Sequence, residues 1–283
     1  MPKPDPTIQR ANAPDFTLKM LDGKAIPQLG LGVYKTPADE TAEIVDFAAG
    51  VGYKMVDTAA FYHNEEGVGQ AVKRHHDLFV TTKLWNTGHG YDVARRAFDE
   101  SMKKLGLDVL DLYLIHWPAP KNNLYVETWK ALIELKKEGR IKSIGVSNFN
   151  VDHLERIIHE TGEVPVINQI ELHPAFQQRH LRAFHDKHGI ITESWSPLGR
   201  GANLDNDVIQ KLAKKHGKSP AQIVIRWHLD QGLVVIPKSS NHQRLQENID
   251  VFDFHLDAAD LADIEKMDRA DGRVGPDPMT ADF

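Results

Sequence analysis

The sequence contains no cysteine, and this absence excludes several classes of protein. A chain of 283 residues without cysteine forms no disulfide, no thiolate metal site and no cysteine nucleophile. It also has no run of about 18 apolar residues that could cross a membrane, and its first residues carry no apolar signal core. We therefore expect a cytoplasmic protein without a membrane partner.

Strong positive charge is missing as well. The 34 lysines and arginines are outnumbered by 40 aspartates and glutamates, which gives a formal net charge of -6. No run of lysine and arginine is longer than two residues. Proteins that bind nucleic acid concentrate such residues on one surface. We therefore expect no nucleic-acid partner.

What the sequence does contain is a repeated alternation of short apolar runs and helical segments. Helical spacing of apolar residues recurs between the runs, and most runs start 23 to 33 residues after the one before. Eight runs rich in β-branched residues are predicted strands, at 29–33, 53–58, 78–84, 109–117, 142–147, 165–172, 190–195 and 233–239. This alternation predicts an α/β fold, a closed parallel (β/α)8 or TIM barrel.

Additional elements are expected around the barrel. A β-hairpin that turns at Asp22-Gly23 precedes it, and two extra helices are predicted, one within 207–232 and one at 256–268. The expected organisation has three parts: a mobile N-terminal segment at 1–15, a single barrel domain at 16–267 and a C-terminal tail at 268–283.

Helix ends are also indicated. Asn64 is a predicted N-cap, and Gly50, Gly106 and Gly139 are predicted C-terminal stops. An open doubly wound sheet is the alternative architecture, but it requires a glycine fingerprint after its first strand, which the chain lacks. The segment that begins at Gly67 resembles such a fingerprint only in part, since Val72 takes the place of the third glycine and the segment has helical character.

Polar residues interrupt the apolar runs at their carboxyl ends. Asp57, Lys83 and His116 stand near the ends of the second, third and fourth predicted strands. In a parallel barrel these ends share one face, where the catalytic groups of the fold gather. We therefore expect the active site at this face.

Asp57, Lys83 and His116, together with a nearby tyrosine, suggest that the site transfers a proton. Asp57 and Lys83 lie on adjacent predicted strands and can form a buried ion pair. Tyr62 lies in the loop that follows the strand of Asp57. A neighbouring ammonium stabilises phenolate, so we expect the pKa of Tyr62 to lie below its ordinary value of about 10. Such a phenol can donate a proton to a developing alkoxide. His116 adds a neutral donor that can orient a carbonyl oxygen.

Each of these residues also has a simpler interpretation. Taken singly, the aspartate could be a helix N-cap, the tyrosine a packing residue, the lysine a solvated charge and the histidine a core residue. Their combination at one rim favours catalysis. No metal site is expected, because the histidine pairs lack carboxylate partners at ligand spacing. A metal-dependent barrel hydrolase stays an alternative, with His116, Asp57 and Glu171 as its only candidate ligands.

Taken together, the motifs resemble those of the aldo-keto reductase family, and within it the bacterial 2,5-diketo-D-gluconate reductase group. The match runs from residue 16 to 254. Its most specific pieces are GYKMVDTAAFYHNEEGVG (52–69), TTKLWN (81–86), DLYLIHWP (111–118), KSIGVSNF (142–149), NQIELHP (168–174), ESWSPLGRG (193–201) and IPKSSNHQRLQEN (236–248).

The resemblance implies NADPH-dependent reduction of aldehydes or ketones, with 2,5-diketo-D-gluconate and methylglyoxal-type carbonyls among the candidate substrates. It places the catalytic tetrad on Asp57, Tyr62, Lys83 and His116, with Tyr62 as proton donor. Pocket walls are expected from Tyr34, Trp85, His116 and Trp117. The implied NADPH contacts are Ser147, Asn148 and Gln169 on the carboxamide, Trp195 on the ring, Ser196, Leu198 and Gly199 along the pyrophosphate, Lys238, Ser239 and Arg244 on the 2′-phosphate, and Glu247 and Asn248 near the adenine.

Some positions depart from the family pattern. Asn241 stands where relatives often carry another arginine, which bears on the preference for NADPH over NADH, and His63 replaces a small residue. The tail after Met267 matches poorly, although the resemblance implies that residues 268–283 lie over the pocket. The resemblance further implies a small-molecule carbonyl substrate and a monomer. A non-catalytic member of the family is the remaining alternative.

Overall fold

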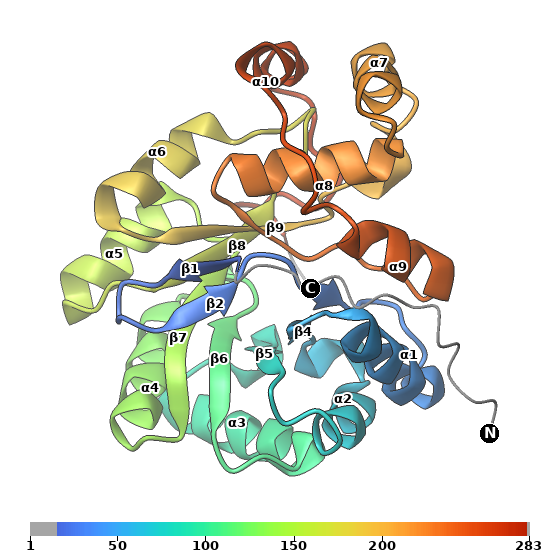
Figure 1. Ribbon diagram of the computed structural model, residues 1–283. Coiled ribbons are helices and arrows are strands. Elements are labelled where there is room, and N and C mark those ends of the chain that lie inside the picture. Colours follow the sequence, from blue (N-terminus) through green and yellow to red (C-terminus); the bar gives the residue numbers. More distant parts are fainter. Residues whose placement is uncertain (1–15, 282–283) are drawn as a thin grey trace.

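Eight parallel strands form the predicted barrel in the computed structural model, which describes residues 16–281 (Figure 1). They are β3 (Leu31–Gly32), β4 (Met55–Asp57), β5 (Phe79–Leu84), β6 (Leu110–Ile115), β7 (Ile141–Ser147), β8 (Ile167–Glu171), β9 (Ile191–Trp195) and β10 (Val234–Val235). Neighbours in the sheet are neighbours in the chain. Parallel bridges from Leu29 to Val235 and from Gly32 to Lys238 join the two ends and close the ring.

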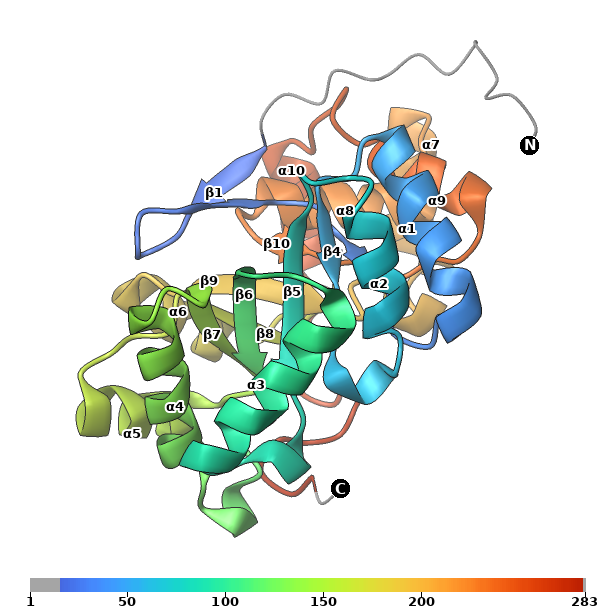
Figure 2. The same ribbon diagram turned by 90° about the horizontal axis from the view of Figure 1, so that it is seen from below.

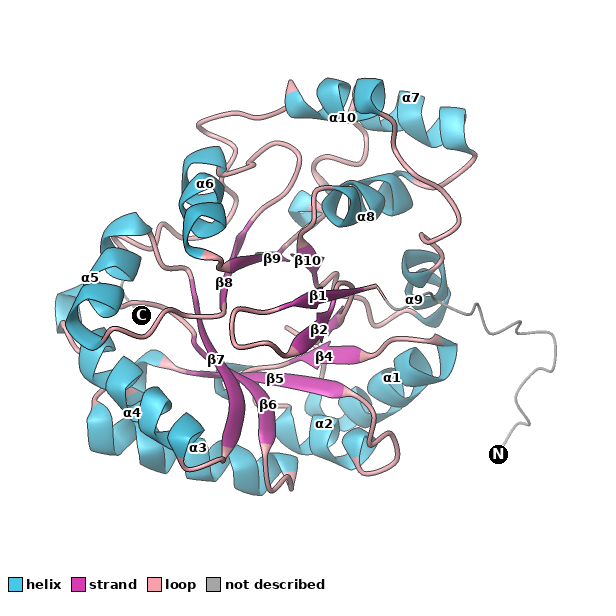
Figure 3. Ribbon diagram, turned by 60° about the vertical axis from the view of Figure 1, so that its left-hand side comes forward, coloured by secondary structure: helices cyan, strands magenta, loops and turns pink. Residues whose placement is uncertain are grey.

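Helices surround these strands (Figure 3). They are α1 (Ala38–Val51), α2 (Glu65–Val72), α3 (Tyr91–Leu105), α4 (Tyr125–Lys137), α5 (Val151–Thr161), α6 (Arg179–His188), α7 (Asp207–His216), α8 (Pro220–Asp230), α9 (His242–Ile249) and α10 (Ala258–Glu265). The two predicted extra helices are α7 and α10, which lie next to each other outside α8 (Figure 1). The fold prediction is therefore confirmed.

The N-terminal hairpin covers the amino ends of the strands. Its strands β1 (Thr17–Lys19) and β2 (Ala25–Pro27) are antiparallel, and Gly23 has a φ of 84° in the predicted turn. Ile26 packs into the barrel interior, and Asp22 accepts a hydrogen bond from Ser143 Oγ at 2.7 Å. Figure 2 shows the hairpin at one end of the strands and the last described residues beyond the other end. The carboxyl ends are thus the face left for a site.

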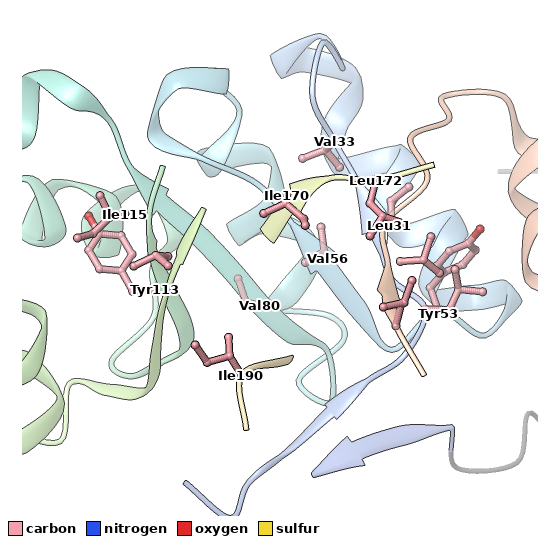
Figure 4. Packing of buried hydrophobic residues seen from close by; sticks show 14 of the residues in the cluster. Leu31, Val33, Tyr53, Val56, Val80, Tyr113, Ile115, Ile170, Leu172 and Ile190 are labelled. Atoms are coloured by element: carbon pink, nitrogen blue, oxygen red, sulfur yellow. The ribbon is translucent and has the colours of Figure 1, made fainter. Parts of the chain in front are cut away.

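The period of two along each strand decides which side chains enter the barrel. In β6, Tyr113 and Ile115 pack outward against the helices (Figure 4), whereas Leu112 and Leu114 belong to the interior cluster. Closer to the carboxyl end of several strands, the residues that point into the barrel are polar instead of apolar. They include Asp57, Lys83, His116, Gln169 and Glu193.

Two details of the helix ends differ from the predictions. Gly50 lies inside α1, and the helix ends at Gly52, whose φ of 117° only glycine adopts readily. Asn64 occupies the N-cap position of α2, but its buried side chain accepts from Thr58 Oγ1 at 2.6 Å and donates to the Val33 carbonyl at 2.9 Å. It therefore connects two loops instead of capping the helix.

Gly106 and Gly139 follow α3 and α4 with positive φ, as predicted. Gly69 lies within α2, where a Cβ would come 2.2 Å from the Leu105 carbonyl oxygen, so close packing against α3 explains this glycine. Across residues 16–281, no helix combines the length and apolar character needed to cross a membrane. The predicted mobility of 1–15 lies outside the described residues.

Candidate active site

A buried ion pair lies at the centre of the carboxyl-end face. Lys83 on β5 is 0% exposed, and its Nζ lies 2.5 Å from Asp57 Oδ1 on the adjacent strand β4 and 2.8 Å from the Thr58 carbonyl oxygen. Burial alone would lower the pKa of Lys83, but the surrounding acidic groups, Asp57 first among them, together outweigh this and the pKa is raised. The lysine is therefore a permanent cation at neutral pH.

Tyr62 lies beside this cation. It ends a short 3-10 helix, Ala60–Tyr62, and Lys83 Nζ is 5.0 Å from the centroid of its ring. The residue is half-buried, yet burial raises the pKa of Tyr62 to about 12, and the Lys83 ammonium only limits the rise. The expected lowering below the ordinary value is therefore wrong for this state of the protein, because burial outweighs the neighbouring charge.

His116 completes the group of four. Its ring meets those of Tyr62 and Trp85 edge to face, with centroid distances of 5.6 and 5.2 Å. Burial, and secondly the Lys83 charge, hold the pKa of His116 well below its usual range. The imidazole is therefore neutral and can donate one N–H to an oxygen in the space that it shares with Tyr62.

The residues expected around the nicotinamide carboxamide also come together. Asn148, with a φ of 63°, donates through Nδ2 to the His116 carbonyl at 2.9 Å and accepts from Trp195 Nε1 at 2.8 Å. Ser147 Oγ donates to the Gln169 carbonyl at 2.8 Å. Gln169 Nε2 in turn donates to Asp57 Oδ2 at 2.9 Å. One hydrogen-bonded network thus joins these side chains to the ion pair.

The loop after β9 begins with two left-handed residues, Ser196 (φ 47°) and Gly199 (φ 56°), on either side of Leu198. At Gly199 a Cβ would come 2.3 Å from Asn203 Nδ2, so the close approach requires glycine. The same Asn203 lies 3.0 Å from His173 Nδ1 beyond β8. The segment expected along the pyrophosphate is therefore held tightly against the rim.

The residues expected at the 2′-phosphate gather at the start of α9. Lys238 and Arg244 are exposed there, and Ser239 Oγ accepts from the Asn241 N–H at 3.1 Å. Asn241 is the N-cap of the helix, because its Oδ1 accepts from the Arg244 N–H at 3.0 Å. Glu247 is exposed and Asn248 buried further along the helix. Two cations at a helix N-terminus suit a phosphate.

Aromatic side chains form the rim of the space in front of Tyr62. Tyr34 is 46% exposed, with its ring 5.0 Å from that of Tyr62, and Phe61 stacks on Trp85 at 3.9 Å. Trp117 is buried. Phe61 was not among the expected pocket residues, although its place directly before Tyr62 could have indicated it. We define Tyr34, Phe61 and Trp85 as the aromatic rim.

The C-terminal tail is attached to the end of β8. Glu171 accepts from the backbone N–H groups of Val274 and Gly275 at 2.5 and 2.8 Å, and His173 Nε2 lies 3.3 Å from the same carboxylate. A Cβ on Gly275 would come 2.4 Å from Trp195 Cη2. The tail therefore runs next to the indole expected to meet the nicotinamide. Glu171 is thus engaged with the tail and does not lie free as a metal ligand.

The described part of the chain contains no group of three or more histidine, aspartate or glutamate side chains that could hold a metal ion. Residues 16–281 therefore offer no set of ligands for the metal ion that a metal-dependent hydrolase would need.

Comparison with known proteins gives consistent matches over nearly the whole chain. The model of the aldo/keto reductase family matches residues 28–269. An aldo-keto reductase of Mycolicibacterium smegmatis is 51% identical over 275 residues, which cover 96% of this chain and 99% of that protein. The methylglyoxal reductase DkgA of Escherichia coli (strain K12) is 56% identical over 267 residues, 92% of this chain and 96% of the relative.

Solved structures agree with these matches. The apo form of Gox0644 superimposes with a TM-score of 0.94 at 61% identity, covering 94% of this chain and 98% of that one. A mutant of Gox0644 in complex with NADPH gives a TM-score of 0.93 at the same identity and coverage.

Proposed function

The chain belongs to the aldo/keto reductase family, and we propose that it reduces small aldehydes or ketones to alcohols with NADPH, Tyr62 being the proton donor. One observation carries the proposal. The phenol of Tyr62, the ammonium of Lys83 and the neutral imidazole of His116 meet at the carboxyl-end rim of the barrel.

Each of these groups has a separate role in the reaction at the carbonyl oxygen. His116 donates a hydrogen bond that orients the oxygen, and Tyr62 transfers its proton as negative charge develops there. Lys83 stabilises the phenolate that remains until solvent returns the proton, and Asp57 holds the lysine in place. A phenol with a pKa of about 12 is fully protonated at neutral pH, which suits a donor. When bound, NADPH supplies the hydride to the carbonyl carbon.

The donor set fits this cofactor. Lys238 and Arg244 at the start of α9 suit the 2′-phosphate, with Ser239, Glu247 and Asn248 beside it. The loop of Ser196, Leu198 and Gly199 suits the pyrophosphate. Ser147, Asn148, Gln169 and Trp195 would hold the nicotinamide, because their amide, hydroxyl and indole groups lie in one network beside the tetrad.

We propose α-dicarbonyls such as methylglyoxal, and the diketo sugar acid 2,5-diketo-D-gluconate, as substrates. The high identity to a reductase named for methylglyoxal supports the first. The aromatic rings of Tyr34, Phe61 and Trp85 lie close to Tyr62 and His116, and aromatic walls of this kind suit small carbonyls. Trp117, which is buried and follows His116 in the chain, is proposed as part of the pocket wall. The proposal includes a cytoplasmic monomer, which the molar mass in solution tests in part.

The direct test is oxidation of NADPH by the purified protein with a panel of carbonyl compounds. We expect methylglyoxal and 2,5-diketo-D-gluconate to accelerate the loss of the reduced-nicotinamide absorbance, in contrast to the matching alcohols. If NADPH bound tightly but no carbonyl of the panel were reduced, the chain would be a non-catalytic member of the family and the proposal would fail.

Arg244→Ala is expected to raise the KM for NADPH by about 10- to 100-fold, the effect of losing one charged hydrogen bond. The KM for NADH should change by less than about threefold, because NADH has no 2′-phosphate. Steady-state kinetics with both cofactors measure this. Gln246→Ala, an exposed change on the same helix, is the control. An equal rise for the two cofactors would contradict the phosphate contact.

A further inference from the structure

Glu193 is a buried acid that the proposed mechanism does not use. It lies in the middle of β9, between Gln169 on β8 and Val234 on β10, and it is 0% exposed. Its parity along the strand is that of Ile191 and Trp195, so its side chain enters the barrel interior. A carboxyl group in this position needs a partner or a proton.

The contacts of Glu193 connect it to the tetrad through one amide. Its Oε2 accepts from Gln169 Nε2 at 3.0 Å, and the same Nε2 donates to Asp57 Oδ2 at 2.9 Å. Among the described residues, Glu193 Oε1 has no hydrogen-bond partner. Lys83, Asp57, Gln169 and Glu193 thus form a continuous row across the interior.

The two carboxyl groups share a single cation. Asp57 contacts the Lys83 ammonium at 2.5 Å, whereas Glu193 contacts only an amide and has the apolar Val234 on its other side. A second buried carboxylate would add uncompensated negative charge, so the proton belongs on Glu193. Burial first, and then the Asp57 charge, raise the pKa of Glu193 to about 8.

The row also determines how the Gln169 amide is turned. A primary amide has two N–H donors, and here one meets Asp57 and the other meets Glu193. The amide oxygen, Oε1, is then the atom left for a partner elsewhere. If the amide were flipped, this oxygen would face the Asp57 carboxylate, which is repulsive.

We propose that protonated Glu193 is a positioning residue that, together with Asp57, turns the oxygen of Gln169 toward the NH2 group of the nicotinamide carboxamide. This inference rests on the proposed function, in which Gln169 contacts the carboxamide. Glu193 acts through Gln169 and touches neither cofactor nor substrate. When it loses its proton above a pH of about 8, the new charge faces Asp57 and Lys83 and opposes phenolate formation at Tyr62, so turnover declines.

Two variants distinguish the effect of the proton on Glu193 from the effect of its hydrogen-bond acceptor. Glu193→Gln keeps an acceptor for Gln169 in a neutral group of the same shape, whereas Glu193→Leu removes the acceptor. Ser194→Ala, a buried change on the same strand with the opposite parity, is the control for simple damage to β9. The measurements are the Kd of NADPH by quenching of tryptophan fluorescence, the pH profile of kcat, and thermal unfolding of the cofactor-free protein.

We expect Glu193→Leu to raise the Kd of NADPH by about 10-fold, the cost of a lost hydrogen bond to a buried group, whereas Ser194→Ala leaves it within about twofold. Glu193→Gln should restore the wild-type Kd and remove the decline of kcat above a pH of about 8.

The cofactor-free protein provides a separate signal. Because the pKa of Glu193 is raised on folding, the wild type loses stability between a pH of about 4.5 and about 8, where only the unfolded chain ionises. Glu193→Gln should therefore have a higher Tm than the wild type at a pH of about 8, with the gap closing toward a pH of about 4.5.

A wild-type Kd in Glu193→Leu would overturn the positioning role. An unchanged alkaline decline or a constant Tm gap in Glu193→Gln would overturn the placement of the proton. If the wild type itself neither bound nor oxidised NADPH, the proposed function would fall, and this inference with it.

Discussion

Tyr62→Phe is expected to lower kcat by at least about 100-fold, because a positioned general acid contributes about 10²- to 10⁴-fold to a proton transfer. Phenylalanine keeps the ring that packs against His116 but cannot donate a proton to the carbonyl oxygen. The Kd of NADPH should stay within about twofold, since the phenol is not among the proposed cofactor contacts. Single-turnover reduction and fluorescence titration measure the two quantities.

The chain offers a matched control for this change. Tyr34 is a tyrosine of the aromatic rim whose ring centroid lies 5.0 Å from that of Tyr62. Tyr34→Phe should alter the KM of the carbonyl substrate and leave kcat nearly unchanged. If Tyr62→Phe retained kcat within about threefold, another group would be the proton donor and the assignment of Tyr62 would be wrong.

Lys83→Met is expected to have the largest effect on stability. It leaves the Asp57 carboxylate buried without its cation, and breaking a buried pair in this way costs about 3–5 kcal/mol of the free energy of unfolding. Burial already raises the pKa of Asp57, opposed first by Lys83. Removing the lysine raises the pKa of Asp57 further, so Asp57 in the variant should bind a proton on folding. The loss of stability relative to the wild type should therefore shrink as the pH falls toward about 4.

Chemical denaturation at several pH values measures this deficit. Lys54→Met is the control, because the Lys54–Asp77 pair is exposed and such pairs contribute about 0–1 kcal/mol. Lys83→Met combined with Asp57→Asn should recover part of the loss, since neither buried charge remains. A deficit that did not depend on pH would show that lost packing, and not the unpaired carboxylate, is the cause. Turnover by a folded Lys83→Met protein should also fall, because nothing then stabilises the Tyr62 phenolate.

The strands, and the gathering of Asp57, Lys83 and His116 at one face of the barrel, could be predicted because both follow from periodicity. Residues such as Leu112 and Leu114 alternate with Tyr113 and Ile115, and polar residues of the inward parity come at the carboxyl end of the same runs. This pattern is local in the sequence. The contact between Lys83 and Asp57 then follows from the pairing of adjacent strands.

Quantities that depend on the whole three-dimensional surroundings could not be predicted in this way. The pKa of Tyr62 rises because atoms from several loops exclude water around it, and the sequence shows only the neighbouring cation. Glu193 stands in the middle of β9 and not at its carboxyl end, so the pattern of polar residues at strand ends does not indicate it. Gly50 and Gly52 are both plausible helix ends, and only the backbone angle distinguishes them.

The attachment of the tail has a consequence for how such enzymes diversify. Glu171 binds main-chain groups of Val274 and Gly275, and every residue except proline supplies such a backbone N–H group. Side chains other than proline can therefore vary along this stretch without detaching it, except at Gly272 and Gly275, where the Ala175 carbonyl and Trp195 leave no room for a methyl group. Natural variation and laboratory libraries can thus change the side chains of this segment next to Trp195 while its attachment to Glu171 stays the same.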